Sequence, residues 1–175
     1  QICPLCLQND EVMFYRKSWR KAWYICCPLH QIRLIDRCPA CQAAIQPHRL
    51  TSINHHHMAE CAVCNFNLLE VKNDPSSAIS QLLIQRNFDT FINNGAAQCQ
   101  DMEMSLPQWF TLASHYIHFL RQTYRTRNKA SVNFLNELGI DILSASYPIN
   151  GLPFETCTID DRDVLLQDTF ILLQI

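Results

Sequence analysis

Residues 26–41 read CCPLHQIRLIDRCPAC and contain two near-copies of one short motif. The first copy is Cys27-Pro-Leu-His30, and the second is Cys38-Pro-Ala-Cys41. Two residues between a pair of Cys or His side chains let one tight turn present both of them to a single ion, and a structural zinc ion takes four such ligands. Each copy therefore supplies half of a zinc site, so the other halves are expected elsewhere in the chain.

The missing halves are Cys3-Pro-Leu-Cys6 and Cys61-Ala-Val-Cys64, which lie 20 residues before and 19 residues after the central motifs. The four pairs predict two structural Zn²⁺ ions per chain. Redox pairs or buried thiols would not explain why His30 stands where a second cysteine is expected. The predicted metal ligands are Cys3, Cys6, Cys27, His30, Cys38, Cys41, Cys61 and Cys64.

The four pairs can be combined in two ways. In the sequential order, the first pair joins the second and the third joins the fourth. In the cross-braced order, the first joins the third and the second joins the fourth, as in the RING modules of ubiquitin ligases. A RING has only a few residues between its His and the next Cys, whereas seven separate His30 from Cys38. The sequential order also closes shorter loops at lower entropic cost, so it is favoured.

Four other groups compete with these ligands or resemble them. Cys26 could replace Cys27, but the Cys-Pro dipeptide shared with the other motifs favours Cys27. The run His55-His56-His57 is interpreted as a solvated loop because the eight ligands are already complete. The lone cysteines Cys99 and Cys157 are expected to be inert.

The composition predicts two parts. Eight of the ten cysteines lie within residues 1–64, in the spacing of metal sites rather than of a secreted disulfide framework, which favours a cytoplasmic location. We predict a small zinc-finger module, similar to a zinc ribbon, over residues 1–73 and an all-α domain over residues 74–175. No apolar run reaches the length of a membrane span. The chain begins with Gln1, just before a cysteine pair, and ends within an amphipathic pattern in the apolar run 170–175. It is therefore interpreted as a fragment of a longer protein.

Four helices are expected in the second part. The first begins at Asp74-Pro75 and ends near Gly95, and the second begins at Ser105-Leu-Pro107, with a strong apolar stripe from Trp109 to Tyr124. A shorter helix is expected over 132–138, a loop over 140–158, and a last helix over 160–173.

Basic side chains cluster in an otherwise acidic chain of net charge −2. The stretch 14–24 has a period of four, which predicts a short amphipathic helix with an aromatic face, a basic face and a following strand at 23–25. The aromatic face is interpreted as the core of the finger, and the basic side chains could contact phosphates, an acidic protein or only solvent. The predicted nucleic-acid contacts are Arg16, Lys17, Arg20, Lys21, Arg121, Arg125, Arg127 and Lys129.

The motifs of residues 1–64 together resemble the TniQ/TnsD family of bacterial transposition proteins. The resemblance rests on the opening Cys3-Pro-Leu-Cys6, on Trp19-x3-Trp23 before Cys27-Pro-Leu-His30, and on a leucine-containing strand before Cys38-Pro-Ala-Cys41. An additional cysteine at position 26 departs from the family pattern. So does the absence of glycine after the motifs, where Leu7, Gln42 and Asn65 stand.

The resemblance implies a target-site selector for DNA transposition. Such a protein binds target DNA or an RNA-guided complex, and it recruits an AAA+ transposition ATPase and, through it, the transposase subunits. The sequence contains no acidic triad, P-loop or nucleophile elbow, so we expect an adaptor and not an enzyme. The alternatives are a RING-like module and a scaffold in which zinc only stabilises the fold.

Overall fold

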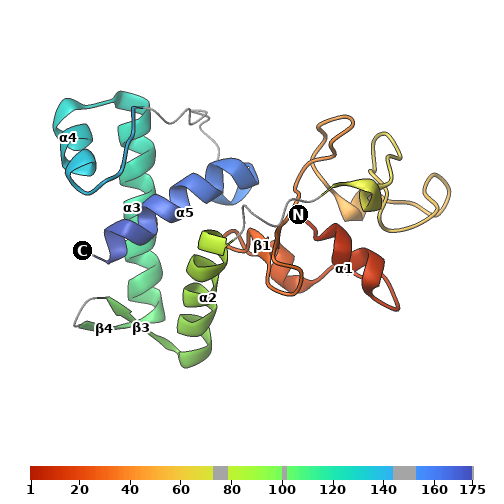
Figure 1. Cartoon of the computed structure of the whole chain (residues 1–175), viewed down its shortest axis with the longest axis horizontal. Helices are drawn as coiled ribbons and strands as arrows, with labels where there is room; N and C mark the ends of the chain where they lie inside the picture. Colours follow the sequence, from red (N-terminus) through yellow and green to blue (C-terminus); the bar gives the residue numbers. More distant parts are fainter. Residues whose placement is uncertain (73–78, 100–101, 144–152, 175) are drawn as a thin grey trace. The chain divides into compact units, whose positions relative to one another are not determined.

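The computed structural model describes residues 1–72, 79–99, 102–143 and 153–174. The chain divides into two compact units, residues 1–83 and 84–175 (Figure 1). The boundary predicted between residues 73 and 74 falls among residues outside the described part of the chain, and it stays a prediction.

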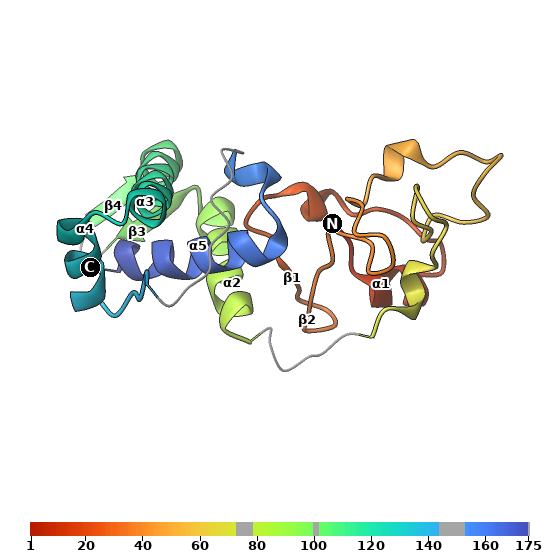
Figure 2. The ribbon, with the colours of Figure 1, turned by 90° about the horizontal axis from the view of Figure 1, so that it is seen from above.

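The N-terminal unit begins with a short helix and a two-stranded hairpin. Helix α1 spans Pro4–Asn9 and has a proline in its first turn, where the missing N–H costs no hydrogen bond. Strands β1 (Cys26–Cys27) and β2 (Ile32–Arg33) pair antiparallel, with Cys27 opposite Ile32 (Figure 2). Ile2 forms a further bridge with Ile35 through N–H···O distances of 2.8 and 2.9 Å, which fixes the first cysteine motif beside the hairpin.

Up to Lys72, the rest of the described chain in this unit consists of turns and three short 3-10 helices, and the unit also includes the first residues of α2 (Ile79–Asn94). These are η1 (Lys17–Arg20), η2 (Pro47–Arg49) and η3 (Leu68–Glu70). Helix α1 packs against η3, where Leu7 and Leu68 are both fully buried. A unit with so little regular structure has a small apolar core, which limits the stability that burial alone can provide.

The predicted amphipathic helix within residues 14–24 is wrong in type and length. Only Lys17–Arg20 is helical, as a 3-10 turn, and the strand that follows is Cys26–Cys27 rather than residues 23–25. Of the predicted aromatic face, Trp19 is buried as expected, whereas Tyr15 and Trp23 are only partly buried. A 3-10 turn has three residues per turn, so it does not line up side chains four residues apart as an α-helix does.

The C-terminal part is mostly helical. The helical elements among its described residues are α2 (Ile79–Asn94), α3 (Leu106–Thr126), α4 (Lys129–Glu137), the 3-10 turn η5 (Phe154–Thr156) and α5 (Ile159–Leu173). The predicted start of the first helix, at Asp74-Pro75, lies outside the described residues. Helix α4 begins three residues earlier than predicted because the Asn128 side chain caps it and accepts from the N–H groups of Ala130 and Ser131.

The core of the C-terminal unit lies where α3 packs against α5, and α4 adds two of its side chains (Figure 1). Tyr124, on the predicted stripe of α3, donates a hydrogen bond to Asp168 of α5 at 3.0 Å. At the start of α3, Trp109 is buried and packs edge-on against Phe88 of α2, with ring centroids 4.7 Å apart. The buried members of the core are Leu120, Tyr124, Val132, Leu135, Ile140, Ile142, Leu165 and Leu172.

The prediction of an all-α domain requires one correction. Strands β3 (Ala96–Cys99) and β4 (Met102–Ser105) form an antiparallel hairpin between α2 and α3, with Ala96 opposite Ser105. Gly95, at φ 74°, ends α2 in a left-handed conformation that suits glycine and lets the chain leave the helix. The hairpin was missed because its strands are short and show no clear alternation of apolar and polar residues.

Candidate metal centres

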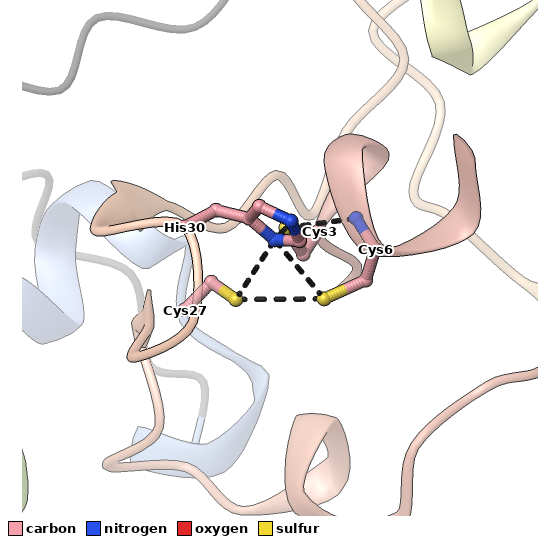
Figure 3. A group of neighbouring side chains, drawn as sticks. All are labelled: Cys3, Cys6, Cys27 and His30. Atoms are coloured by element: carbon pink, nitrogen blue, oxygen red, sulfur yellow. Dashed lines mark hydrogen bonds between the residues drawn. The ribbon is translucent and has the colours of Figure 1, made fainter. Parts of the chain in front are cut away.

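The first cluster brings together four side chains from α1 and the β1–β2 hairpin. Cys3 is the N-cap of α1 and Cys6 lies in its first turn, while Cys27 ends β1 and His30 lies in the hairpin turn. His30 Nδ1 lies 3.5 Å from Cys3 Sγ, 3.4 Å from Cys6 Sγ and 3.6 Å from Cys27 Sγ (Figure 3). One ring nitrogen therefore faces three sulfurs, and the three cysteines are buried.

The second cluster consists of four cysteines on two turns. Cys38 Sγ lies 3.7 Å from Cys64 Sγ, and Cys41 Sγ lies 3.6 Å from Cys61 Sγ. Each turn is closed by an isolated β-bridge, Arg37 with Ala44 and Glu60 with Asn67. Cys38 and Cys61 are buried, whereas Cys41 and Cys64 are exposed, so one side of this cluster faces solvent.

Both clusters have the dimensions of a tetrahedral zinc site. With Zn–S near 2.3 Å and Zn–N near 2.0 Å, the sulfurs of a tetrahedral site lie about 3.8 Å apart and a sulfur lies about 3.5 Å from the nitrogen. One cluster has three sulfurs and one nitrogen, the other has four sulfurs, and the ligand atoms of each cluster lie within 4.8 Å of one another. The residues present therefore fit a zinc ion in each cluster.

The grouping of the pairs follows the sequential order. The first pair lies with the second, and the third lies with the fourth. The cross-braced order would require Cys3 and Cys6 to lie with Cys38 and Cys41, and the structure does not bring them together. The arrangement that defines a RING is therefore not the one that this chain adopts.

The thiols of the first cluster share hydrogen bonds that favour a thiolate. The pKa of Cys27 is lowered to about 4, mainly because Cys3 donates a hydrogen bond to its sulfur, with further help from the His30 backbone N–H. That same hydrogen bond, together with burial, raises the pKa of Cys3. Burial raises the pKa of Cys6 to about 11, and the nearby Arg16 opposes this increase. A cluster that stabilises the thiolate form of Cys27 is suited to binding a metal cation.

In the second cluster, backbone amides stabilise the thiolate. Burial alone would raise the pKa of Cys61, but hydrogen bonds from the backbone N–H groups of Cys64 and Val63 outweigh it and lower the pKa to about 7. The pKa of Cys38 is raised, chiefly by burial. N–H groups that point at sulfur from within a two-residue turn are the feature expected of a metal-binding Cys-x2-Cys motif.

Among the described residues, the competing groups belong to neither cluster. Cys26 is buried next to Cys27, but it belongs to neither group of ligand atoms. His57 Nε2 lies 3.4 Å from Glu60 Oε1, and His55 Nδ1 contacts the backbone of Thr51. The thiol of Cys157 is buried and donates to the Pro153 carbonyl at 3.5 Å. The side chain of Cys99 lies outside the described residues.

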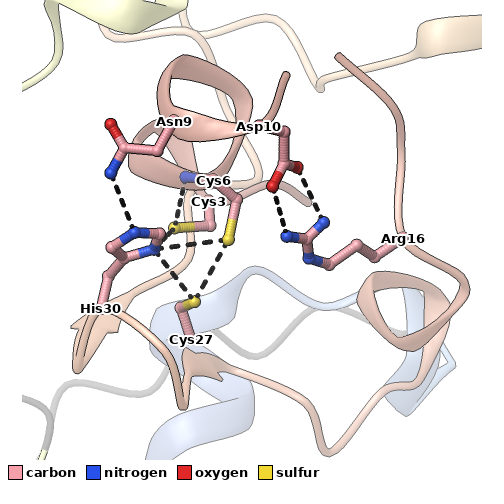
Figure 4. Close-up of polar contacts among 7 residues, drawn as sticks. All are labelled: Cys3, Cys6, Asn9, Asp10, Arg16, Cys27 and His30. Carbon is pink, nitrogen blue, oxygen red and sulfur yellow. Dashed lines mark hydrogen bonds and ion pairs between the residues drawn. The ribbon is translucent and has the colours of Figure 1, made fainter. Parts of the chain in front are cut away.

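Two polar contacts around the first cluster were not anticipated from the sequence. Asn9, the last residue of α1, places its side-chain Nδ2 3.2 Å from His30 Nε2. Arg16 forms a two-pronged ion pair with Asp10, with both N···O distances at 2.9 Å (Figure 4). The spacing Cys3-x2-Cys6-x2-Asn9, which continues one face of a helix, is the signal that could have identified Asn9.

The four predicted nucleic-acid contacts of the N-terminal unit differ in their surroundings. Lys17 and Arg20 are exposed on η1. Arg16 is occupied by Asp10, and its guanidinium carbon lies 4.6 Å from the centre of the Phe14 ring. Lys21 Nζ lies 5.6 Å from the centre of the Trp23 ring. Lys17 and Arg20 are therefore the side chains of this group best presented to a partner.

The other four predicted nucleic-acid contacts lie near the junction of α3 and α4. Arg125 is in the last turn of α3 and donates to Gln122 at 2.6 Å, and Arg127 ends that helix in a left-handed conformation at φ 49°. Lys129 opens α4, and Arg121 lies one turn before Arg125 and is partly buried. Arg125, Arg127 and Lys129 are exposed. They belong to the C-terminal unit, whereas Lys17 and Arg20 belong to the N-terminal unit.

The fold and the two clusters define a small Cys/His cluster module, followed by a mostly helical unit. A family model described as TniQ matches residues 1–34. The match includes the whole first cluster and both strands of the hairpin, and it is shorter than the 64 residues whose motifs resemble the family. It indicates a role associated with transposition, in a family whose members are generally not catalytic.

The comparisons with curated proteins and with solved structures found no match. In the described part of the chain, no helix combines the length and the apolar character needed to cross a membrane.

Proposed function

We propose that the chain is a zinc-dependent, non-catalytic adaptor that selects target sites in DNA transposition. In this role it binds target DNA or an RNA-guided complex and recruits the AAA+ transposition ATPase and transposase subunits. The observation that carries the proposal is the TniQ match over residues 1–34, which contains the first Cys/His cluster. Zn²⁺ in both clusters, held by the eight predicted ligands, would give this module its fold.

Zinc has a structural role in this proposal. A closed site with four protein ligands leaves no position for a substrate, so the ion holds α1, the hairpin and the following turns together. In a unit with a small apolar core, metal binding contributes directly to the free energy of folding. The stabilised module then presents the exposed side chains of η1 at a fixed place.

Nucleic-acid contact is assigned to two surfaces. One contains Lys17 and Arg20, and the other contains Arg125, Arg127 and Lys129. Arg16 acts within the unit through Asp10, and Lys21 lies against Trp23, so both contribute less than the sequence suggested. Few phosphates would be neutralised and residues 74–175 have eleven acidic against six basic side chains, so the affinity of this chain alone is expected to be weak.

The experiment compares two charge reversals of equal size in the N-terminal unit. Lys17→Glu with Arg20→Glu alters η1, and Arg49→Glu with Lys72→Glu is the control, because these two side chains are also exposed. Affinity for duplex DNA and for RNA is measured over a range of salt concentrations. The η1 variant should bind at least tenfold more weakly and reduce the slope of log K against log salt by about 2, whereas the control should change both much less.

A second pair tests the helical surface. Lys129→Glu should weaken binding, whereas Arg86→Glu, an exposed change on α2 with the same charge difference, should have a smaller effect. If the variant and its control lost the same affinity in each pair, only the net charge of the chain would matter. That result would contradict both assigned surfaces. If nucleic-acid binding is unchanged but binding to the transposition ATPase is lost, the basic residues dock a protein. That result would favour the scaffold alternative.

A further inference from the structure

The two nitrogens of His30 face different partners. Nδ1 is directed at the three sulfurs of the first cluster, between 3.4 and 3.6 Å away. Nε2, on the far side of the ring, lies 3.2 Å from the side-chain amide of Asn9 (Figure 4). If Nδ1 binds a metal, the neutral ring carries its proton on Nε2, so the outer nitrogen must donate.

Asn9 is held in place by the same helix that supplies two cysteines. Cys3 caps α1, Cys6 lies in its first turn and Asn9 is its last residue. Residues three apart on a helix lie close to the same face, so this spacing directs the amide toward the ring that completes the cluster. The fold thus delivers two predicted ligands and one outer contact on a six-residue helix and its N-cap.

We propose that Asn9 is a positioning residue that fixes the ring orientation and tautomer of His30. The proposal rests on metal binding by the first cluster, as proposed above. An asparagine amide presents either a donor, Nδ2, or an acceptor, Oδ1, at one place, because rotation by 180° about its last torsion exchanges the two atoms. In the metal-free ring Nε2 accepts from Nδ2, and in the metal-bound ring Nε2–H donates to Oδ1.

This contact distinguishes the two clusters. Outer hydrogen bonds to a metal-binding histidine orient the ring and raise its basicity, and losing one typically lowers metal affinity 10–100-fold. The second cluster consists of four cysteines, so a change at Asn9 should leave it unaffected. It therefore serves as an internal control within the same chain.

The experiment uses the intact chain loaded with zinc. Asn9→Leu removes both the donor and the acceptor, Asn9→Asp keeps an acceptor, and Gln8→Leu is a matched change on the preceding exposed residue of α1. Zinc affinity is measured by competition with a chromophoric chelator, and the exchange of the His30 Nε2 proton with water is followed by NMR. Asn9→Leu should weaken one of the two zinc sites 10–100-fold and speed proton exchange.

Asn9→Asp should retain at least wild-type affinity, and Gln8→Leu should match the wild type in both measurements. Wild-type affinity and proton exchange in Asn9→Leu would overturn the proposal. If the leucine variant does not fold, the aspartate variant decides: an affinity loss of tenfold or more would overturn it. If the wild-type chain binds no zinc, both the positioning role of Asn9 and the proposed zinc binding are overturned. If the wild type binds two zinc ions and Asn9→Leu has no effect, only the role of Asn9 is overturned.

Discussion

The backbone N–H of Gln31 donates to the carbonyl oxygen of Cys27 at 2.8 Å, and Gln31 has a left-handed conformation at φ 53°. The same turn recurs after the other two motifs that do not enter a helix. Gln42 donates to Cys38 at 2.8 Å and Asn65 donates to Cys61 at 3.0 Å, both with positive φ. The repeated sequence motif is therefore also a repeated backbone turn.

This turn predicts an order of stability at position 31. A β-branched residue is strongly disfavoured at positive φ, whereas glycine is not. Gln31→Val should lower the free energy of unfolding of the zinc-loaded module by about 1–2 kcal/mol relative to Gln31→Gly. Thermal unfolding followed by circular dichroism measures the difference.

Position 46 provides the control for this comparison. Gln46 has a negative φ, −126°, at which a β-branched residue such as valine is not strained. Gln46→Val should therefore be at least as stable as Gln46→Gly. The same order at both positions would mean that backbone conformation does not determine the effect.

The two clusters should lose metal in a fixed order. Cys41 and Cys64 are exposed, whereas the three cysteines of the first cluster are buried. Access to sulfur limits attack by thiol reagents, so the second cluster should react first. Limited alkylation with mass spectrometry should find Cys41 and Cys64 labelled as the first zinc ion is released. Early labelling of Cys3 or Cys6 would contradict this order.

The sequence was sufficient to predict the metal ligands, but it predicted little of the contacts around them. The repeated pairs predicted the eight residues that the structure groups in two clusters, because ligand spacing is a local property. The spacing of Cys3, Cys6 and Asn9 places Asn9 on the helix face of the ligands, but its contact with His30 depends on how α1 meets the hairpin, and the Asp10–Arg16 ion pair depends on how the chain turns after α1. The η1 segment was misassigned for a related reason, since the turns around the first cluster and a small core override helix periodicity there.

The Asp10–Arg16 pair should stabilise the N-terminal unit modestly. Both side chains are one-fifth exposed, and the two-pronged geometry is favourable. A double-mutant cycle with Asp10→Asn and Arg16→Gln should give a coupling free energy of about 0.5–1 kcal/mol that decreases as salt is added. A coupling of zero would mean that Arg16 is available to other partners, including phosphates.

The stability of the helical unit should depend on pH through Asp168. Burial raises the pKa of this carboxyl group above its ordinary value of 3.8, and the hydrogen bond from Tyr124 opposes the increase. The folded state therefore favours the neutral acid, so its contribution to stability is full below pH 3.8 and decreases as the pH rises through the raised pKa.

Asp168→Asn mimics the neutral acid and keeps an acceptor for Tyr124. The variant and the wild type should have similar stabilities near pH 3, and the variant should be the more stable at pH 7. Unfolding curves across this range measure the difference. A difference that is constant with pH would show that Asp168 does not titrate differently on folding.

Counting zinc in three purified chains tests most directly whether the Cys3/Cys6/Cys27/His30 cluster and the four-cysteine cluster each bind one zinc ion. Cys26 and Cys27 are adjacent and both buried, but only Cys27 belongs to a cluster. We predict two zinc ions per chain in the wild type and in Cys26→Ala, and one in Cys27→Ala, by elemental analysis. Fewer than two in the wild type, or equal losses in the two variants, would contradict the account.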